Sequence, residues 1–482
     1  MVDLPSQGHW TSGGASRIEL IPMKPHNSSP EKITPDKELR DLREINSRSW
    51  PGRLAGYASR SGPGWIQGAL TLGASSATSA FYLGWKFGYE MLWVNVLGML
   101  MGVIMFGAIA RPTLFKKESI YRAMGRHVSP TLALTWALAA IVGSIFWSMN
   151  QYSVATACLG DLAVVAGWAE TSTSEQTIKW ILGLVILGVS IPLTWAYGKP
   201  TSAGVQRYEK SLRIIVAIML LCFLIVALRT GVDWGRVLRG LVPSGLPDDP
   251  ADRTMVLGAL GCAVGINMTF LFPLTLQARS WGREHLGLTR FDLWGGMLLP
   301  FAVGSSLVVI TTANILQGSP EAPANPAAVA SVMSPLFEGT LVPASTGRVL
   351  FDIGVAAMPL STIPILMLIT GLAVAEVMHV PRTSRWFKIG ALLPAIGILG
   401  VGYKAPFWLG PLISSFGLIL LPIAYLGFLL LTNNKNFMGD DREKGNSRIA
   451  WNIAMTIACL IAIIGAFVKV KDTVGALVQG LN

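Results

Sequence analysis

Two stretches of the chain gather small, hydroxyl and amide residues inside otherwise apolar segments. Residues 73–79 read GASSATS, and residues 258–273 contain three glycines, Asn267 and Pro273. In a helix interior, glycine costs about 1 kcal/mol and proline about 3 kcal/mol relative to alanine, so both stretches predict interrupted helices. Backbone groups freed at such a break, together with nearby hydroxyls, could bind an ion or a small polar solute.

The elements that carry these stretches are predicted to be membrane-spanning helices. The chain has 482 residues, of which 52% are hydrophobic and only 13% are charged, whereas soluble proteins are about 25% charged. We therefore predict an all-α polytopic membrane protein. Windows of about twenty apolar residues, each long enough to cross a bilayer, lie near 63–84, 90–110, 131–158, 178–197, 211–229, 255–278, 293–316, 349–378, 387–403, 407–432 and 449–470.

The charged residues between these windows predict an orientation. Basic residues concentrate in the loops at 111–126, 199–210, 279–290, 382–388 and 435–448, whereas the loops at 168–177 and 317–347 contain none. By the positive-inside rule, this alternation predicts a multi-pass protein of the cytoplasmic (inner) membrane, with its N-terminus inside and its C-terminus outside. The net charge of +11 then reflects membrane orientation, and we expect the lipid bilayer, not nucleic acid, as the partner.

The predicted organisation has three parts. Residues 1–60 form a basic, largely disordered cytoplasmic tail, in which a short helix near 36–47 fits the sequence. The membrane domain, 61–472, comprises a first repeat at about 63–229, a second at about 255–432 and an extra span at about 449–470, followed by an outer tail at 473–482. Interrupted segments in the first and sixth spans favour two inverted five-helix halves around a midplane site. Close helix packing at small residues is the alternative interpretation.

Five segments resemble the NRAMP (natural resistance-associated macrophage protein) family of divalent-metal transporters. These segments are GPGW at 62–65, FGYEMLWV at 87–94, GVQRYEKSLRIIVAIMLLCF at 204–223, QARSWG at 277–282 and LLTNNKNFMGD at 430–440. The resemblance implies a LeuT-like 5+5 inverted repeat plus an eleventh span, with spans one and six interrupted. It also implies alternating-access symport of divalent metal ions.

The chain departs from the family at the residues that the resemblance would assign to metal. The family's Asp-Pro-Gly-Asn motif in span one falls on Gly73, Ala74, Ser75 and Ser76. Its Met-Pro-His motif in span six falls on Gly265, Ile266 and Asn267, and a second span-six histidine falls on Phe272. The family's acidic pair in span three falls on Asn150 and Ser153. The carboxylate, thioether and proton-linked groups are therefore all predicted to be replaced.

What remains is a neutral, hydroxyl-rich site. The predicted substrate-binding residues are Gly73, Ala74, Ser75, Ser76, Thr78, Cys262, Gly265, Asn267 and Thr269, and the coupling candidates are Asp352, Asn150 and Ser153. A bare divalent ion needs matching donors and a nearby anion, so we expect no transition-metal site. The predicted cargo is a hydrated ion such as magnesium, or a small polar organic solute. Trp147 and Tyr152 belong to an interfacial belt or line the route to this site.

Two further interpretations compete with transport. A non-transporting membrane sensor or scaffold has a precedent in the NRAMP-like membrane domain of the plant ethylene-signalling protein, although nothing in this chain's tail resembles a signalling domain. An enzyme is disfavoured because no nucleophile–base arrangement or nucleotide-binding loop is visible. The four cysteines lie singly in apolar runs, which is typical of packed core residues. We therefore expect no cofactor, and a small solute or ion as the only other partner.

Overall fold

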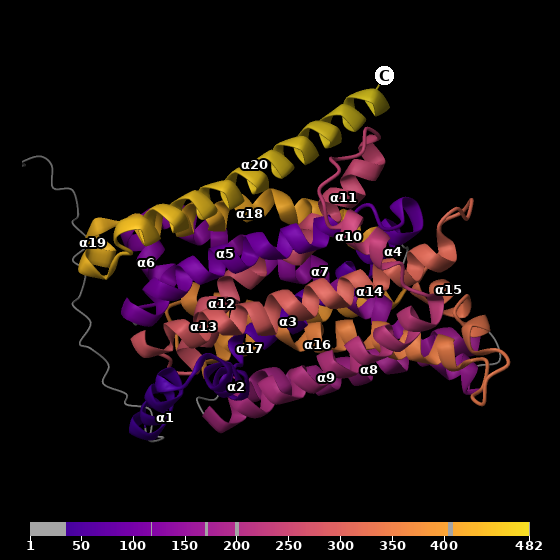
Figure 1. Cartoon of the computed structure of the whole chain (residues 1–482), viewed down its shortest axis with the longest axis horizontal. Helices are drawn as coiled ribbons and strands as arrows, with labels where there is room; N and C mark the ends of the chain where they lie inside the picture. Colours follow the sequence, from indigo (N-terminus) through magenta and orange to yellow (C-terminus); the bar gives the residue numbers. More distant parts are fainter. Residues whose placement is uncertain (1–34, 117, 169–171, 198–201, 403–407, 482) are drawn as a thin grey trace, which may run out of the picture.

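The computed structural model describes residues 35–116, 118–168, 172–197, 202–402 and 408–481. Within these ranges the protein is all-helical, and its long helices run roughly parallel to one axis (Figure 1). Ten helical segments of this part of the chain are long and apolar enough to cross a membrane. The predicted first span is not one of the ten, because a break divides it into helices of 9 and 14 residues.

The spans follow the predicted order. The first half consists of α3 (Pro63–Thr71), α4 (Ala74–Phe87), α5 (Leu92–Lys116), α7 (Pro130–Val165), α8 (Ser172–Tyr197) and α9 (Ser202–Thr230). The second half consists of α11 (Pro250–Ala263), α12 (Ile266–Ala278), the π-helical η2 (Leu293–Leu298), α14 (Leu299–Leu316), α16 (Thr346–Val377), α17 (Arg385–Leu392), the 3₁₀-helical η4 (Leu393–Gly402) and α18 (Leu409–Asn433). The last span is α20 (Gly445–Leu481).

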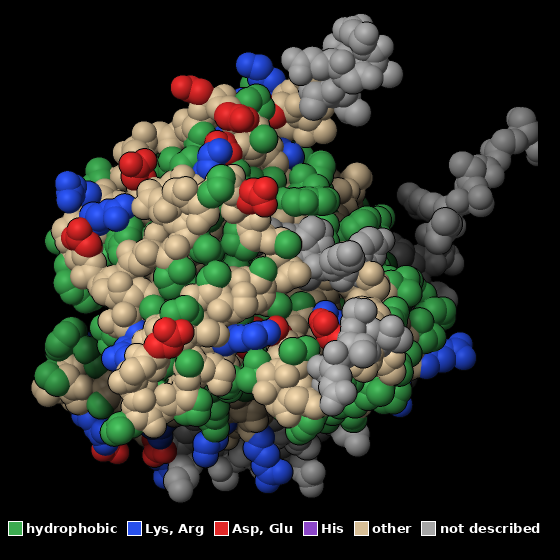
Figure 2. Space-filling model, turned by 90° about the vertical axis from the view of Figure 1, so that its right-hand side faces the viewer, with side chains coloured by type: hydrophobic (Ala, Val, Ile, Leu, Met, Phe, Trp, Pro, Cys, Tyr) green, Lys and Arg blue, Asp and Glu red, His purple; other side chains and the backbone are tan. Residues whose placement is uncertain are grey.

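Short helices join the spans at the two ends of the bundle. They are α1 (Pro35–Ser47), α2 (Trp50–Arg60), α6 (Ile120–His127), α10 (Trp234–Gly240), η1 (Arg283–His285), α13 (Leu286–Asp292), α15 (Pro326–Ser331), η3 (Ser334–Phe337), α19 (Lys435–Met438) and η5 (Gly439–Asp441). Figure 1 places α1, α6, α13 and α19 at one end, and α10, α15 and the C-terminus at the other. Figure 2 views the second end, where acidic and basic side chains are both scattered among uncharged ones.

The broken helices lie in the interior. The apolar windows of α11–α12 and α16 are 94% and 83% buried, whereas those of α8 and α20 are only 22% and 33% buried. The outer helices expose apolar side chains such as Leu184 and Ile453, which is what lipid-facing helices require. The interior position of α3–α4 and α11–α12 leaves their breaks accessible only to neighbouring helices and to a bound cargo.

The structure corrects the predicted tails at both ends. Residues 35–60 are helical: α1 and α2 pack on each other, and α1 buries Ile45 and also Leu42, which joins the main core. The helix expected near 36–47 is α1 itself. Residues 1–34 lie outside the described part of the chain. At the other end, α20 continues to residue 481, where a separate outer tail from 473 was expected; its Asp472 accepts two bonds from Arg253.

Candidate substrate site at the two helix breaks

The first break lies where α3 gives way to α4. The chain is unwound at Leu72 and extended at Gly73, whose φ is −107° and ψ is −176°. The N–H of Ala74, at the start of α4, donates to Oε1 of Gln151 on α7 at 2.8 Å. The hydroxyl of Thr362 on α16 donates to a carbonyl in the last turn of α3 at 3.2 Å. Two neighbouring helices therefore supply the hydrogen bonds that the interrupted helix lacks.

The second break lies between α11 and α12. Val264 and Gly265 are both extended, with φ/ψ of −140°/108° and −85°/155°. The N–H of Gly265 donates to Sδ of Met268 at 3.3 Å. The hydroxyl of Thr71, the last residue of α3, donates to the carbonyl of Ala263 at 2.8 Å. That bond ties the two breaks directly to each other across the centre of the bundle.

A small cavity opens where the breaks meet. It is lined by Leu70, Thr71, Gly73, Ser75, Ser76, Trp147, Gln151, Cys262, Gly265, Asn267, Met268, Thr362 and Leu366. None of these side chains is acidic, basic or a histidine. Six of the residues predicted to bind substrate are thereby brought together: Gly73, Ser75, Ser76, Cys262, Gly265 and Asn267. The arrangement can offer amide and hydroxyl oxygens, two sulfur atoms and backbone carbonyls to a bound molecule.

A family model described as natural resistance-associated macrophage protein-like (Nramp) matches residues 64–468. The chain belongs to the Nramp family. Similar proteins include the divalent metal cation transporter MntH of Agrobacterium fabrum, 23% identical over 416 residues, covering 83% of this chain and 85% of the relative. The MntH of a Nostoc species is 23% identical over 454 residues, covering 91% and 96%. These relatives are named as transporters, so this Nramp protein is a transporter and not an enzyme.

Solved structures agree with the predicted fold. The manganese transporter of Eremococcus coleocola superposes with a TM-score of 0.66 at 16% identity, covering 86% of this chain and 87% of that chain. MhsT in complex with L-phenylalanine superposes with a TM-score of 0.51 at 12% identity, covering 84% and 98%. The predicted resemblance and the LeuT-like inverted-repeat fold, with spans one and six interrupted, are therefore confirmed.

Three predicted substrate residues of this Nramp protein do not line the cavity. Ala74 meets the site through its backbone N–H, which Gln151 occupies. The hydroxyl of Thr78 turns back to the carbonyl of Ala74 at 3.0 Å. The hydroxyl of Thr269 accepts a bond from Trp136 Nε1 at 2.9 Å. Sequence counting placed these side chains near the breaks, but a bond within α4 holds the Thr78 hydroxyl and a bond from α7 holds the Thr269 hydroxyl.

The three coupling candidates lie in different places. Asn150 donates from Nδ2 to the Ser75 hydroxyl at 3.2 Å and so contacts the first break. Ser153 is buried on α7 but is not among the cavity-lining residues. Asp352 is fully buried on α16, ten residues before Thr362, or about 15 Å from the cavity along the helix axis. The Arg348 guanidinium, which binds the Asp161 carboxylate through two hydrogen bonds, lies one turn from Asp352 on the same helix.

Several cavity residues were not predicted. Gln151 and Thr362 come from α7 and α16, far in sequence from either break; the only signal was an uncharged polar residue in the middle of an apolar span. Met268 follows Gly265 by three residues and therefore lies on the same side of the helix. Its thioether lines the cavity, although the sequence analysis expected no thioether at this site. Trp147 lines the cavity, as one of its two predicted roles required.

The site is electrostatically neutral. No group of three or more histidine, cysteine, aspartate or glutamate side chains that could hold a metal occurs in the described ranges. Phe272, to which counting along the sequence assigned the family's second span-six histidine, stacks on Phe106 with ring centroids 4.9 Å apart. This position is therefore part of an aromatic contact between α5 and α12. Because no side chain in the site carries an opposite charge, the charge of an ionic cargo would have to be stabilised by groups that enter with it, such as bound water.

Buried polar contacts lie at one end of each broken helix. Glu209 on α9 forms an ion pair with Arg279, the residue after α12, at 3.6 Å, and their side chains are only 3% and 7% exposed. Arg279 also donates to the carbonyl of Arg60, before α3, at 3.1 Å. The Asp292 carboxylate accepts the N–H of Gly64 at 2.6 Å, which fixes the start of α3. The ends of both broken helices are thus held by buried charged groups on the side of α1 and α13.

Proposed function

We propose that this Nramp protein is a secondary transporter that works by alternating access, with its cargo bound in the cavity between the two breaks. We further propose that the cargo is a divalent cation that keeps part of its water shell, with magnesium as the ion that the donors suit best. The observation that carries this proposal is the lining of the cavity: oxygen donors from amides and hydroxyls, and no carboxylate or imidazole.

The choice of ion follows from hydration. Moving an unpaired ion from water into a medium of low dielectric constant costs tens of kcal/mol by Born reasoning, and no lining side chain carries a compensating negative charge. Mg²⁺ gives up its waters reluctantly and is commonly bound through several of them. Side-chain amides such as those of Gln151 and Asn267, and hydroxyls such as that of Ser75, can hydrogen-bond those waters. The sulfur atoms of Cys262 and Met268 would suit a softer ion, but they supply no anionic charge.

The proposed placement has the end with α1, α6, α13 and α19 in the cytoplasm and the protein in the inner membrane, with the C-terminus outside. The basic loops at 111–126, 279–290 and 435–448 all belong to this end, which supports the placement by the positive-inside rule. The ion pair between Glu209 and Arg279 then closes the inner side of the cavity. Alternating access requires that this closure open while the outer side closes.

Asp352 is the proposed coupling residue. It is a fully buried carboxyl group in a membrane helix, close to the Asp161–Arg348 pair, and intramembrane acids of this kind mark proton or ion pathways. Asn150 and Ser153 carry no ionisable group; Asn150 is proposed only to shape the first break, through its bond to Ser75. Replacing Asp352 with Asn is expected to abolish the response of uptake to an imposed pH gradient while leaving uptake down a cation gradient.

Uptake into proteoliposomes tests the function. We expect the purified full chain to load a trapped Mg²⁺-sensitive dye, with empty liposomes and an Asn267→Leu variant giving no signal above background. Saturable Mn²⁺ uptake without Mg²⁺ uptake would contradict the proposed selectivity. Flux of a small polar solute, without flux of any cation, would contradict the proposal that the cargo is a cation. No flux of any kind would favour the sensor or scaffold.

A further inference from the structure

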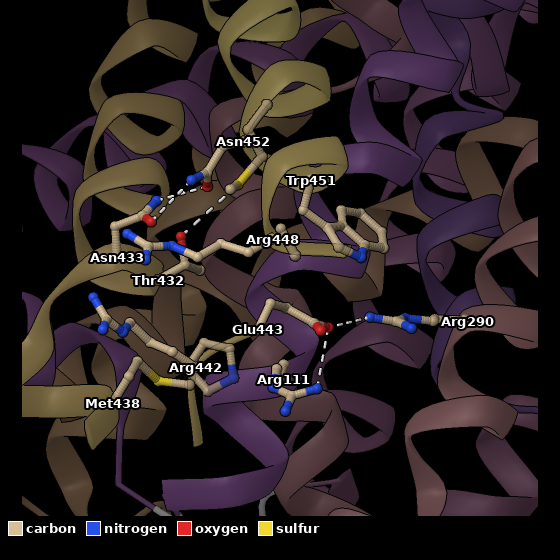
Figure 3. A pocket seen from close by; sticks show the side chains of 13 residues that line it. Arg111, Arg290, Thr432, Asn433, Met438, Arg442, Glu443, Arg448, Trp451 and Asn452 are labelled. Carbon is tan, nitrogen blue, oxygen red and sulfur yellow. Dashed lines mark hydrogen bonds and ion pairs between the residues drawn. The ribbon is translucent and has the colours of Figure 1, made fainter. Parts of the chain in front are cut away.

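A second pocket lies between α5, α18 and α20 (Figure 3), and none of its lining residues belongs to either helix break. It is at the end of the bundle that carries α19 and α13. Four arginines contribute to its lining, Arg111, Arg290, Arg442 and Arg448, together with a single carboxylate, that of Glu443. Four guanidinium groups around one carboxylate leave a strong excess of positive charge in one concave site.

Two of these arginines are already paired, and they share one carboxylate. Oε1 of Glu443 accepts a bond from Arg111 at 3.1 Å and one from Arg290 at 2.9 Å. The carboxylate of the neighbouring Asp441 is already paired with two other cations, because its Oδ2 is 2.8 Å from both Lys116 Nζ and Arg283 Nη2. Hydrogen bonding to Lys116, helped by Arg283, holds the pKa of Asp441 below its usual range, so this carboxylate is committed to those cations.

Arg442 and Arg448 have no such partner. Within the part of the chain that the structure describes, neither guanidinium forms an ion pair, and Nε of Arg442 is buried without a hydrogen-bond partner. In Figure 3 both guanidinium groups extend toward Asn433 and away from Glu443. A buried donor without an acceptor is costly, so the pocket lacks an acceptor that these two side chains could share.

The wall beside these arginines is held in a fixed arrangement. Asn433 on α18 and Asn452 on α20 exchange reciprocal amide hydrogen bonds of 2.8 Å and 3.1 Å. The Arg290 guanidinium lies 4.9 Å from the ring centroid of Trp451, which adds a cation–π contact between α13 and α20. Because these contacts position α18 and α20, the Arg442 and Arg448 side chains face a preformed site.

The pocket is next to the lipid-facing surface. On α18, Leu426 and Leu430 are 39% and 53% exposed, and they lie on the same helix face as Asn433, which lines the pocket. An occupant can therefore place a charged group in the pocket while its hydrocarbon lies along α18. Basic pockets between membrane helices on the cytoplasmic side are suited to phosphate-bearing lipid head groups.

We propose that this pocket binds the phosphate of an anionic phospholipid from the inner leaflet, with Arg442 and Arg448 as its ligands. Guanidinium groups bind phosphate oxygens through paired, charge-assisted hydrogen bonds, which supplies the missing acceptor. The exposed Leu426 and Leu430 favour a lipid over free phosphate, because only a lipid also covers them. The inference concerns the edge of the bundle and does not depend on the cargo of the central cavity.

Lipid binding to the purified full chain tests the proposal. Titration with phosphatidylglycerol or phosphatidylcholine, read by native mass spectrometry and by the unfolding temperature, is expected to show a clear preference for phosphatidylglycerol. An Arg442→Gln/Arg448→Gln variant is expected to lose about 30-fold in affinity for phosphatidylglycerol, from the contribution of two arginines near a membrane surface. The matched control, Arg382→Gln/Arg385→Gln, removes two arginines outside the pocket and is expected to keep the preference.

Two further arms identify the ligand. Inorganic phosphate alone is expected to bind much more weakly than phosphatidylglycerol; equal affinity would overturn the lipid assignment. Single Arg448→Gln and Arg448→Lys variants keep the test valid if the double variant does not fold, and the lysine variant is expected to retain more lipid binding than the glutamine variant. Unchanged phosphatidylglycerol binding in the arginine-to-glutamine variants would overturn the proposal.

Discussion

At the scale of single residues, Gly73 is the position to which counting along the sequence assigned the family's first aspartate. An added Cβ at Gly73 would lie 3.0 Å from Gln151 Nε2 and 3.0 Å from Thr362 Oγ1, so both side chains would have to give by a few tenths of an ångström. An aspartate at this position would place its carboxylate among existing polar groups.

This geometry gives a direct prediction. Gly73→Asp is expected to create Mn²⁺ binding that is at least about tenfold tighter than in the wild type, because a carboxylate adds a charge-assisted contact, measured by calorimetry on the purified protein. Gly73→Asn is the matched control, with the same shape and no charge. An equal gain in both variants would show that space, not charge, limits metal binding.

Gln151 is predicted to be structural as well as cargo-binding. Gln151→Ala removes the acceptor of the Ala74 N–H and leaves a buried donor unsatisfied, at a cost of about 1–3 kcal/mol. We expect a lower unfolding temperature and reduced uptake. Gln151→Glu keeps an acceptor oxygen and is expected to retain more stability than the alanine variant; if it is as unstable as alanine, the hydrogen bond to Ala74 is not what holds the break.

At the scale of helices, sequence reasoning located the breaks but not the groups that support them. Gly73 and Gly265 were predictable because small residues interrupt apolar runs, a local signal. Gln151 and Thr362 were not, because their role arises only when α7 and α16 pack against the breaks. Thr269 was predicted to face the site, but Trp136 engages its hydroxyl from α7. A local pattern cannot report a partner that only the tertiary fold supplies.

The start of α3 provides a test at this scale. The Asp292 carboxylate accepts N–H groups from Gly62 at 3.1 Å and Gly64 at 2.6 Å. Asp292→Asn replaces one acceptor oxygen with an amide and is expected to cost about 1.5–3 kcal/mol, the range for hydrogen bonds to charged groups, seen as a lower unfolding temperature. Asp233→Asn is the control, because asparagine caps an exposed helix such as α10 as well as aspartate does. Equal stability of the two variants would contradict this role of Asp292.

At the scale of the whole molecule, the eleven spans and their order were predictable because each must match the thickness of a bilayer. The helix α1 was expected near 36–47, but α2 was missed, because a short segment becomes stably helical only when it finds a partner surface. Here α2 packs on α1, which buries Leu42 and Ile45. The closure formed by Glu209 and Arg279 was likewise invisible in sequence. Glu209 lies on α9 in the first half of the fold, whereas its partner Arg279 comes from the second half.

That closure predicts how the transporter changes state. Glu209→Gln leaves the buried Arg279 charge without its anion, which typically costs 3–5 kcal/mol, and opening toward water relieves the cost. With Cys158, Cys222 and Cys459 replaced by serine, we expect a water-soluble maleimide applied from the inner side to label Cys262 at least about tenfold faster than in the parent. A Glu44→Gln control removes only an exposed partner of Arg48 and is expected to label at the parental rate.

The double variant Glu209→Gln/Arg279→Gln separates gating from simple damage to the structure. It removes both charges, so no uncompensated charge remains to favour opening, and replacing a whole buried pair is often close to neutral. We therefore expect Cys262 labelling to fall back toward the parental rate. Labelling that stays as fast as in the single variant would mean that the side chains close the site by packing, and that the charge pair is not the gate.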